Sequence, residues 1–383
     1  MWCHFICPEP DSSYHLLVTR TEIDALMTIR SNFILSCLLA LLSSGAFAQD
    51  TLTVCAQGCD YARIQDAIDA ASEGDVIELR AETYTPDSSI NPEGKALTLL
   101  GVVDEDGLPA SVIDGRDTIR PIRCANSETA LTIFQNLVVT RGSASGSGGG
   151  MYVGPGATPL VRNCLFIANA CTGDGGGIVN IASFPTLIDT VFSGNVAGNS
   201  GGGICNFNGS NPTITNCLFE GNTANYGGGI VNLYGSAPVL FSCRFLDNIA
   251  LLRGGGIADR SDSGSMVISC EFTGNEAAIE GGGVYNGSDI IAPTISDSFL
   301  CGNTPEEIVG IWNDAGDNCI GSTCLDCDIP CPADADGDGM VDGADLTMFL
   351  GAWDTADPLF DYDGNGMVDG ADLLVILGAW GDC

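Results

Sequence analysis

The amino-acid sequence predicts an all-β protein, a parallel β-helix solenoid with an N-terminal capping helix, followed by a small α-helical C-terminal domain. Three observations lead to this prediction. Glycine triplets recur every 26 or 27 residues, Phe-x-x-Asn motifs run in step with them, and two nearly identical Asp-rich segments of twelve residues lie near the C-terminus. Such periods are typical of solenoids, in which each turn of the chain packs against its neighbours.

Residues 1–48 are predicted to be a leader. An arginine, the apolar run Phe33–Leu42 and the small-x-small sequence Ala46-Phe47-Ala48 indicate a secretory signal peptide whose translation starts at Met27. The apolar run is shorter than the roughly 20 residues that a membrane span needs. We therefore expect the mature chain to begin at Gln49, to have no membrane span after cleavage, and to be secreted or held at the extracellular cell surface.

The charge balance limits the partners. The sequence has 13 Lys+Arg against 49 Asp+Glu, and the leader holds two and four of these, which leaves 11 against 45 and a charge of −34. This balance argues against nucleic acid and favours a cation or a neutral glycan on the β-helix. Both histidines, His4 and His15, lie in the leader. Histidine-dependent nucleophiles and metal sites are therefore excluded from the mature chain.

The repeats define the β-helix over residues 49–320. Each repeat holds two or three short strands broken by Gly and Asn, which adopt positive-φ turns readily. Stacked about 4.8 Å apart, such strands place equivalent residues in columns. The glycine triplets are Gly148–150, Gly175–177, Gly201–203, Gly227–229, Gly254–256 and Gly281–283. The Phe-x-x-Asn motifs begin at Phe166, Phe192, Phe219, Phe245 and Phe272.

The N-terminal part of the solenoid begins with a predicted cap. Ile64, Ala67, Ile68 and Ala71 have the spacing of one face of a short amphipathic helix, which Gly74 ends. Such a helix covers the apolar end of a coil stack. Strand-like segments then lead into the repeats, and we expect about eight or nine coils through Ile311.

The stretch "IQDAIDAASEGDVIEL…TYTP…GKALTLLG" resembles the opening of right-handed parallel β-helix proteins of the pectin-lyase-like superfamily. The resemblance implies a right-handed parallel β-helix solenoid. The alternating Gly-Gly-Gly-[Ile/Val] and Phe-x-x-Asn motifs are similar to the repeats of chlamydial polymorphic outer-membrane proteins. The resemblance to the superfamily implies that enzymes are one class of relative. The lyases of this superfamily use an arginine base with Ca²⁺. Its hydrolases use paired Asp residues near the motifs Asn-Thr-Asp, Gly-His-Gly and Arg-Ile-Lys. None of these three motifs occurs here.

No catalytic residue is assigned. The glycine triplets lack the Lys-Ser/Thr of phosphate loops, so we interpret them as a turn that recurs in every coil. The asparagines are expected to hydrogen-bond from coil to coil. Glu220, Arg244 and Glu271 fall at similar places on successive coils, and we expect a surface ladder of opposite charges.

Cysteines divide into two predicted groups. Of 18 in the sequence, 15 follow the leader, so at least one thiol is free in the exported protein. Cys217, Cys243 and Cys270 have the repeat spacing and are expected to be buried thiols. Disulfides are expected elsewhere. They involve Cys55 with Cys59, Cys331 with Cys383, and the group Cys301, Cys319, Cys324 and Cys327 around the linker 321–330, where export favours disulfides over a zinc cluster.

Residues 331–383 contain two predicted calcium loops, "DADGDGMVDGAD" and "DYDGNGMVDGAD". Oxygen ligands at loop positions 1, 3, 5, 9 and 12, with glycine at 6 and a backbone carbonyl at 7, match the EF-hand loop. The first site comprises Asp334, Asp336, Asp338, Met340, Asp342 and Asp345. The second comprises Asp361, Asp363, Asn365, Met367, Asp369 and Asp372.

Asp at position 12, no entering helix and the duplicated layout make 331–383 resemble a dockerin. This resemblance implies two Ca²⁺ sites and attachment to a cohesin-like or cell-surface protein. Loop positions 10 and 11 are Gly-Ala in both copies, where cellulosomal dockerins commonly have Ser-Thr. The calcium prediction carries over, whereas the identity of the partner does not.

Together these features predict a secreted calcium-binding β-helix protein that is not catalytic and acts in surface attachment, adhesion or glycan interaction. The alternative is an extracellular polysaccharide-degrading enzyme, a hydrolase or a lyase, that carries a dockerin. Clustered acidic residues in one groove with an arginine and aromatic platforms would favour the enzyme. A flat face of Ser, Thr, Asn and Gly would favour the surface protein.

Overall fold

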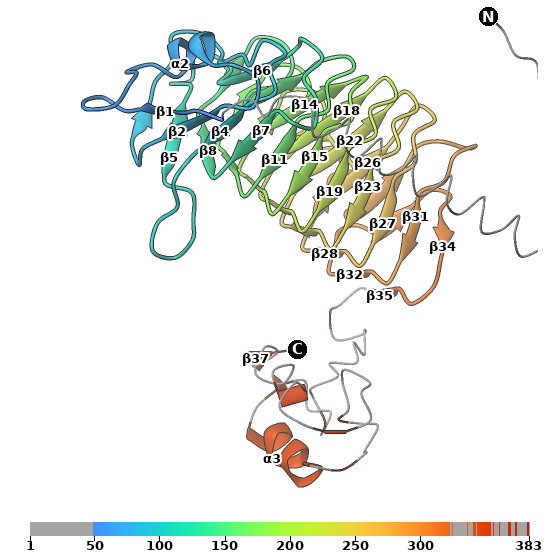
Figure 1. The fold of residues 1–383 in the computed structure, drawn as a ribbon. Coiled ribbons are helices and arrows are strands. Elements are labelled where there is room, and N and C mark those ends of the chain that lie inside the picture. Colours follow the sequence, from blue (N-terminus) through green and yellow to red (C-terminus); the bar gives the residue numbers. More distant parts are fainter. Residues whose placement is uncertain are drawn as a thin grey trace, which may run out of the picture. The chain divides into compact units, whose positions relative to one another are not determined.

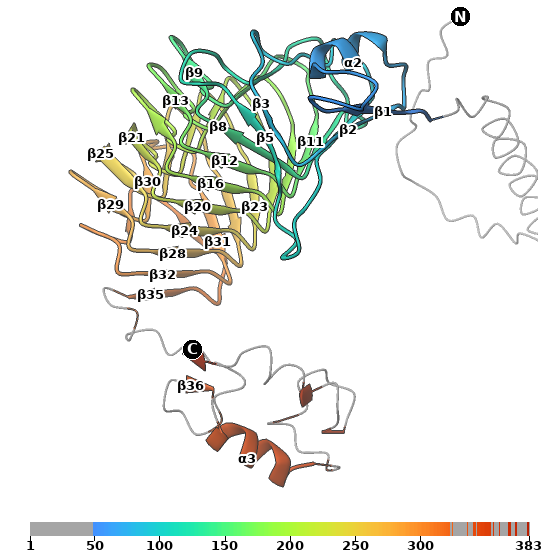
Figure 2. The same cartoon turned by 90° about the vertical axis from the view of Figure 1, so that its left-hand side faces the viewer.

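The computed structural model describes residues 49–321, 324, 335, 340–341, 343–353, 355, 360, 367–368, 372–373 and 381–382. The predicted leader, with its start at Met27, lies outside the described residues. Residues 49–321 form the predicted parallel β-helix (Figures 1 and 2). Two helices have both ends within the described residues, α2 (Ile64–Ala70) and α3 (Gly343–Gly351). Neither is long and apolar enough to cross a membrane.

Three long parallel sheets form the walls of the solenoid, and neighbouring strands in each belong to successive coils. Sheet A comprises, in order, β1 (Thr51–Val54), β2 (Val76–Leu79), β4 (Thr98–Leu100), β7 (Ile133–Gln135), β11 (Leu160–Arg162), β15 (Thr186–Ile188), β19 (Thr213–Thr215), β23 (Val239–Phe241), β27 (Met266–Ile268), β31 (Thr294–Ser296) and β34 (Asn313–Asp314). Sheet B comprises β3 (Thr83–Tyr84), β5 (Ser111–Asp114), β8 (Leu137–Thr140), β12 (Leu165–Ile167), β16 (Val191–Ser193), β20 (Leu218–Glu220), β24 (Arg244–Leu246), β28 (Glu271–Thr273), β32 (Phe299–Cys301) and β35 (Cys319–Gly321).

Sheet C is the third wall, and the shorter sheet D precedes it in each repeat. Sheet C comprises β6 (Ile122–Cys124), β10 (Met151–Val153), β14 (Ile178–Ile181), β18 (Ile204–Phe207), β22 (Ile230–Leu233), β26 (Ile257–Asp259), β30 (Val284–Asn286) and β33 (Ile308–Val309). Sheet D comprises β9 (Ser143–Ala144), β13 (Ala170–Cys171), β17 (Val196–Ala197), β21 (Thr223–Tyr226), β25 (Ile249–Arg253) and β29 (Glu276–Ala277).

The stack is longer than the eight or nine coils expected. Sheet A has 11 strands and sheet B has 10. The prediction omitted β1, which lies before the cap helix and pairs in parallel with β2, and it stopped before β34 and β35. These end strands lack the repeat motifs, and their pairing with a neighbouring coil is what places them in the sheets.

The cap helix α2 has the predicted buried face. Ile64, Ala67, Ile68 and Ala71 are all buried and belong to the core cluster of the solenoid. Figure 1 shows α2 at the β1 end of the stack. The helix ends at Ala70, earlier than predicted, because Ala71 already has an extended backbone; Gly74 (φ +91°) lies in the turn beyond.

Each glycine triplet forms the recurring turn that was predicted, and this turn connects a strand of sheet D to the next strand of sheet C. The first glycine has positive φ in every copy, for example +61° at Gly227. A Cβ on Gly228 would lie 2.6 Å from the carbonyl oxygen of Gly255 in the next coil, and one on Gly229 would lie 2.9 Å from the Phe245 ring. Successive coils can pack this closely only without side chains at these positions.

The phenylalanine and asparagine columns form as predicted. Phe166, Phe192, Phe219, Phe245 and Phe272 are buried and stack with centroids 4.5 to 5.2 Å apart. In the first asparagine column, each side-chain amide donates to the carbonyl oxygen of the next. This column comprises Asn169, Asn195, Asn222, Asn248, Asn275 and Asn303. A second column of Asn180, Asn206 and Asn232 ends at the buried carboxylate of Asp259.

The cysteines divide as predicted where they are described. Cys55 and Cys59 form a disulfide, as do Cys301 and Cys324, and Cys319 is also disulfide-bonded. The free thiols in the described residues are all buried and comprise Cys124, Cys164, Cys171, Cys205, Cys217, Cys243 and Cys270. Cys327, Cys331 and Cys383 lie outside the described residues.

The predicted charge ladder is incomplete. Arg244 pairs in register with Glu271, and Arg244 Nε lies 2.5 Å from Glu271 Oε2. Glu220 instead pairs in register with Leu246, because alignment of Phe219 with Phe245 places Leu218 opposite Arg244. The expectation that Glu220 belongs to this ladder was therefore wrong.

Candidate functional site

The outward side of sheet C carries a row of residues in exact register along the solenoid. The row comprises Arg123, Tyr152, Val179, Cys205, Val231, Ala258 and Tyr285. Neighbouring residues of the same strands, such as Ile178 and Ile204, belong to the inner core, whereas Val179 and Cys205 belong to a second apolar cluster. Because side chains alternate along a strand, the row faces away from the core.

Four arginines stack on three tyrosines along this side of the protein. We call this set the Arg–Tyr face; it comprises Arg120, Arg123, Tyr152, Tyr226, Arg253, Arg260 and Tyr285. Most of its members lie in β6, β10 and β30 of sheet C and in β21 and β25 of sheet D. Figure 1 labels β6, and Figure 2 labels β21, β25 and β30.

At the N-terminal end of this face, two guanidinium groups approach one ring. Arg120 lies 5.2 Å and Arg123 lies 5.9 Å from the centroid of Tyr152. Arg120 donates to the carbonyl oxygens of Gly148 and Ser147, both at 2.7 Å. Burial, together with the charge of Arg123, lowers the pKa of Arg120. Arg120 is thus held in place by the backbone, whereas Arg123 is exposed to solvent.

Farther along, Tyr226 and Arg260 meet across the row. Tyr226 is the last residue of β21 in sheet D, and Arg260 directly follows β26 in sheet C. The Arg260 guanidinium lies 3.7 Å from the ring centroid of Tyr226. Tyr226 packs against the apolar cluster that contains Val231 and Ala258, so the stacked pair helps to cover this part of the row.

Arg253 and Tyr285 complete the C-terminal end of the face. The Arg253 guanidinium lies 5.5 Å from the Tyr285 centroid, and its Nε lies 2.8 Å from Glu280 Oε2. Glu280 thereby raises the pKa of Arg253. Arg253 in β25 lies next to Tyr226 in the adjacent strand β21, because the two residues pair in register.

The Arg–Tyr face gathers basic residues in a chain that has few. Four of the 11 Lys and Arg residues after position 48 lie on it. Within the described residues, Arg253 is the one of these four that forms an ion pair. Guanidinium groups stacked on aromatic rings keep outward N–H donors for a ligand. The face therefore offers aromatic platforms and hydrogen-bond donors to an elongated polar ligand.

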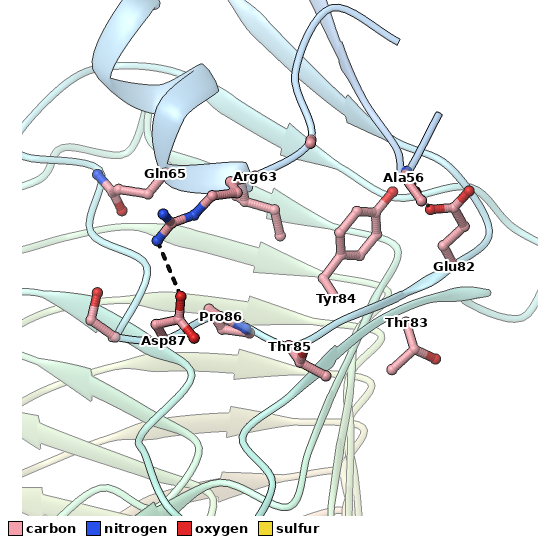
Figure 3. A pocket seen from close by; sticks show the side chains of 12 residues that line it. Ala56, Arg63, Gln65, Glu82, Thr83, Tyr84, Thr85, Pro86 and Asp87 are labelled. Carbon is pink, nitrogen blue, oxygen red and sulfur yellow. Dashed lines mark hydrogen bonds and ion pairs between the residues drawn. The ribbon is translucent and has the colours of Figure 1, made fainter. Parts of the chain in front are cut away.

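A separate pocket lies beside the cap helix (Figure 3). It has a volume of about 250 Å³ and is lined by the start of α2, by Ala56 and by residues 82–88. Its polar groups have partners within the protein: Arg63 faces Asp87 at 3.5 Å, Tyr84 Oη donates to the carbonyl oxygen of Val54 at 2.7 Å, and Glu82 accepts from the backbone N–H of Ala56. These contacts connect the cap to the first coils.

The predicted calcium ligands are described only in part. Asp334, Asp336, Asp338, Asp342, Asp361, Asp363, Asn365 and Asp369 lie outside the described residues. Met340 lies in β36 (Met340–Val341), which pairs antiparallel with β37 (Gly381–Asp382), and Met367 is exposed. The two position-12 carboxylates, Asp345 and Asp372, are fully buried. Asp345 lies in α3, which follows the first loop as predicted, and its Oδ1 accepts from the backbone N–H of Ala335 at 2.7 Å.

No group of three or more potential metal-ligating side chains occurs in the part of the chain that is described. Eight of the twelve predicted ligands lie outside that part, so the two-site calcium prediction stays a prediction. Phe349, Phe360 and Val368 form a small core with Val341 and Ala352.

Comparison with known proteins identifies the repeat. A model of the Chlamydia polymorphic membrane protein repeat matches residues 189–206, which contain Phe192, Asn195 and the triplet Gly201–203. No curated protein matches the sequence. The dockerin resemblance stays a prediction, because the matched repeat lies within the β-helix.

Two solved structures are similar to this chain. One is pectate lyase Pel9A, with 14% identity and a TM-score of 0.37 over 73% of this chain and 81% of that one. The other is a mannuronic acid specific polysaccharide family 6 lyase enzyme from human gut microbiota, with 12% identity and a TM-score of 0.33 over 70% of this chain and 78% of that one.

Proposed function

We propose that this protein is an exported, non-catalytic β-helix that binds a polysaccharide along its Arg–Tyr face. The observation that carries the proposal is the series of Arg–Tyr stacks aligned with the solenoid axis. Sugar rings present apolar C–H faces that pack on aromatic rings and hydroxyl groups that accept hydrogen bonds from arginine. A straight row of such groups suits a chain-like ligand better than a compact one.

The charge of the face bears on the kind of polysaccharide. The net charge of the chain led us to expect a neutral glycan, but this face holds four arginines, of which Arg253 is paired with Glu280. Carboxylates form strong, charge-assisted hydrogen bonds with guanidinium groups. We therefore propose that a carboxylate-bearing polysaccharide binds more tightly at low salt than a neutral one, and that the difference shrinks as salt rises.

The second candidate is a polysaccharide-degrading enzyme, and the lowered pKa of Arg120 is the observation that favours it. A lowered pKa favours the neutral guanidine, which is the form that can accept a proton. However, Arg120 donates to two backbone carbonyl groups, and Glu280 is engaged with Arg253. These engagements support binding over catalysis, because a general acid or base needs to reach the substrate.

The experiment is isothermal titration of the full exported chain with a polyuronate and with a neutral β-glucan, at low and at high salt. We expect Arg123→Gln and Tyr285→Ala to weaken binding. The matched control is Arg162→Gln, since Arg162 lies on sheet A and bonds Gln135. The proposal fails if neither polymer binds. Release of reducing ends or unsaturated sugars, measured on the same samples, would establish the enzyme instead.

We also propose that residues 331–383 bind two Ca²⁺ ions and attach the protein to a cohesin-like or cell-surface partner. The buried carboxylates of Asp345 and Asp372 fit this proposal, because a buried carboxylate needs compensating charge or hydrogen bonds. They are the position-12 residues of the two loops. When bound, Ca²⁺ would offset the mutual repulsion of the clustered carboxylates and hold the segment folded.

The test is calorimetric titration of Ca²⁺ into the full chain, with Asp345→Asn and Asp372→Asn as variants. We expect two sites in the natural protein and loss of one site in each variant. Circular dichroism with and without a chelator should show a gain of helix with Ca²⁺. Absence of calcium binding would refute the attachment proposal and leave polysaccharide binding by the β-helix untouched.

A further inference from the structure

We infer that the Arg–Tyr face consists of two separate stations that a single extended ligand chain must span, so that affinity depends on chain length. This inference rests on the proposed polysaccharide binding. The N-terminal station comprises Arg120, Arg123 and Tyr152. The C-terminal station comprises Tyr226, Arg253, Arg260 and Tyr285.

The register fixes the length of the face from its first tyrosine, Tyr152, to its last, Tyr285. Tyr152 pairs with Val179, and the row continues strand by strand to Ala258 and Tyr285. Tyr152 and Tyr285 are thus five strand spacings apart. At about 4.8 Å for each spacing, their backbones lie about 24 Å from each other. A mono- or disaccharide is too short to contact both ends.

The strands of sheets C and D between the stations, β13, β14, β17 and β18, contain no arginine and no tyrosine. Val179 in β14 is 1% exposed and Cys205 in β18 is 0% exposed, and the partly buried Ile181 and Phe207 pack against the cluster that contains them. Val231 and Ala258 follow in the row and lie beneath the Tyr226–Arg260 stack of the C-terminal station. The Arg–Tyr stacks are therefore confined to the two stations. A continuous site would instead carry them along its middle.

The scaffold holds the two stations at a constant distance. The buried asparagine column and the stacked phenylalanine rings pass through every coil between the stations. Once one end of a ligand is bound, a rigid spacing gives the other end a high effective concentration at the second station. Each station alone binds weakly, and both together bind strongly if the ligand is long enough.

The test uses size-graded oligogalacturonates, with a graded cello-oligosaccharide series in parallel, titrated into the full chain. We expect affinity to rise abruptly, at least tenfold, at the length that spans the two stations and to change little beyond it. Arg123→Gln disables one station and Arg260→Gln the other. Either variant should reduce the affinity of long oligomers to that of short ones, whereas Arg162→Gln should leave the step intact.

The possible outcomes separate this inference from the proposed function. A gradual increase of affinity with length, with both variants weakening short and long oligomers equally, would overturn the two-station arrangement and keep polysaccharide binding. No binding by any oligomer or by the parent polymers would overturn the proposed function itself. Circular dichroism of each variant ensures that a loss of affinity is measured on folded protein.

Discussion

The guanidinium of Arg260 lies 3.7 Å from the ring centroid of Tyr226, although these residues come from successive coils and from opposite ends of the sheet C strands. Their stack lies over the outward apolar row, in which Val231 and Ala258 are completely buried. This pair therefore contributes both a ligand platform and a cover for apolar surface.

Tyr226→Ala should destabilise the protein by about 2 kcal/mol, because it removes the ring that covers Val231 and Ala258. Tyr226→Phe retains the ring and should cost less than about 0.5 kcal/mol. Urea unfolding followed by circular dichroism measures both. Equal stability of the two variants would show that the ring does not cover the row.

Gly228→Ala should destabilise the solenoid by about 3 kcal/mol or prevent folding, because the new Cβ would lie 2.6 Å from the Gly255 oxygen and 2.7 Å from Ile249 N. The matched control is Gly146→Ala. A Cβ at Gly146 meets no atom within 4 Å, and this substitution should leave stability unchanged or raise it by about 0.5 kcal/mol. Thermal and urea unfolding compare the two; a well-tolerated alanine at Gly228 would contradict the packing explanation.

Asn222→Ala should cost about 3 kcal/mol. The Asn222 amide donates to Asn248 Oδ1 and to the Phe192 carbonyl oxygen, and its own Oδ1 accepts from Asn195. Removing it leaves several buried polar groups without partners. The control Asn199→Ala removes an exposed bond to Asp174 and should change stability by less than about 0.5 kcal/mol. Urea unfolding gives both values.

The buried thiols should not react with a water-soluble disulfide reagent while the protein is folded. Burial raises the pKa of Cys164 to about 12 and that of Cys171 to about 11, so little reactive thiolate forms near neutral pH. Unfolding in guanidinium should release at least the seven thiols that are free in the described residues. Rapid labelling of the folded protein at these positions, located by mass spectrometry, would contradict the prediction.

Asp259 should make folding less favourable as pH rises. Burial raises the pKa of this carboxyl above its value in the unfolded chain, so the folded state retains the proton to higher pH. Its contribution to stability is therefore greatest below the unfolded pKa and is lost as pH rises through the folded pKa. Asp259→Asn should remove this dependence. Unfolding curves from acid to neutral pH, taken as the difference between wild type and variant, check the sign.

Local sequence patterns were enough to predict the repeating parts of the fold. The period of the glycine triplets fixed which residues stack, and the Phe and Asn columns followed, since a one-residue slip would turn the buried side chains outward. The buried face of α2 and the free thiol column were predictable for the same reason. The end strands β1, β34 and β35 were not, because they lack the repeat and depend on pairing with a neighbouring coil.

The candidate site was largely missed. Tyr152, Tyr226 and Arg260 occupy positions at which other repeats have different residues, so no periodic signal marked them. One signal was available. Tyr152 and Val179 each lie two residues after a glycine triplet, so alignment of the triplets places them in one row. Arg123 joins this row because β6 pairs in register with β10. The error at Glu220 has a similar origin, because similar repeat positions were compared without aligning Phe219 exactly with Phe245.

By itself, the sequence determined the solenoid, its cap and its inner columns. The solenoid and its columns depend on a period that recurs in every repeat, and the cap depends on the regular spacing of its apolar residues. It also determined that no histidine follows position 48 and that two Asp-rich segments lie near the C-terminus. The tertiary structure alone decided that arginines and tyrosines far apart in the chain share one face, and that the apolar row between them is closed. The physical reason is that these contacts form between side chains of different coils. The register of the strands determines which side chains are adjacent, and the neighbouring residues determine which of them are covered.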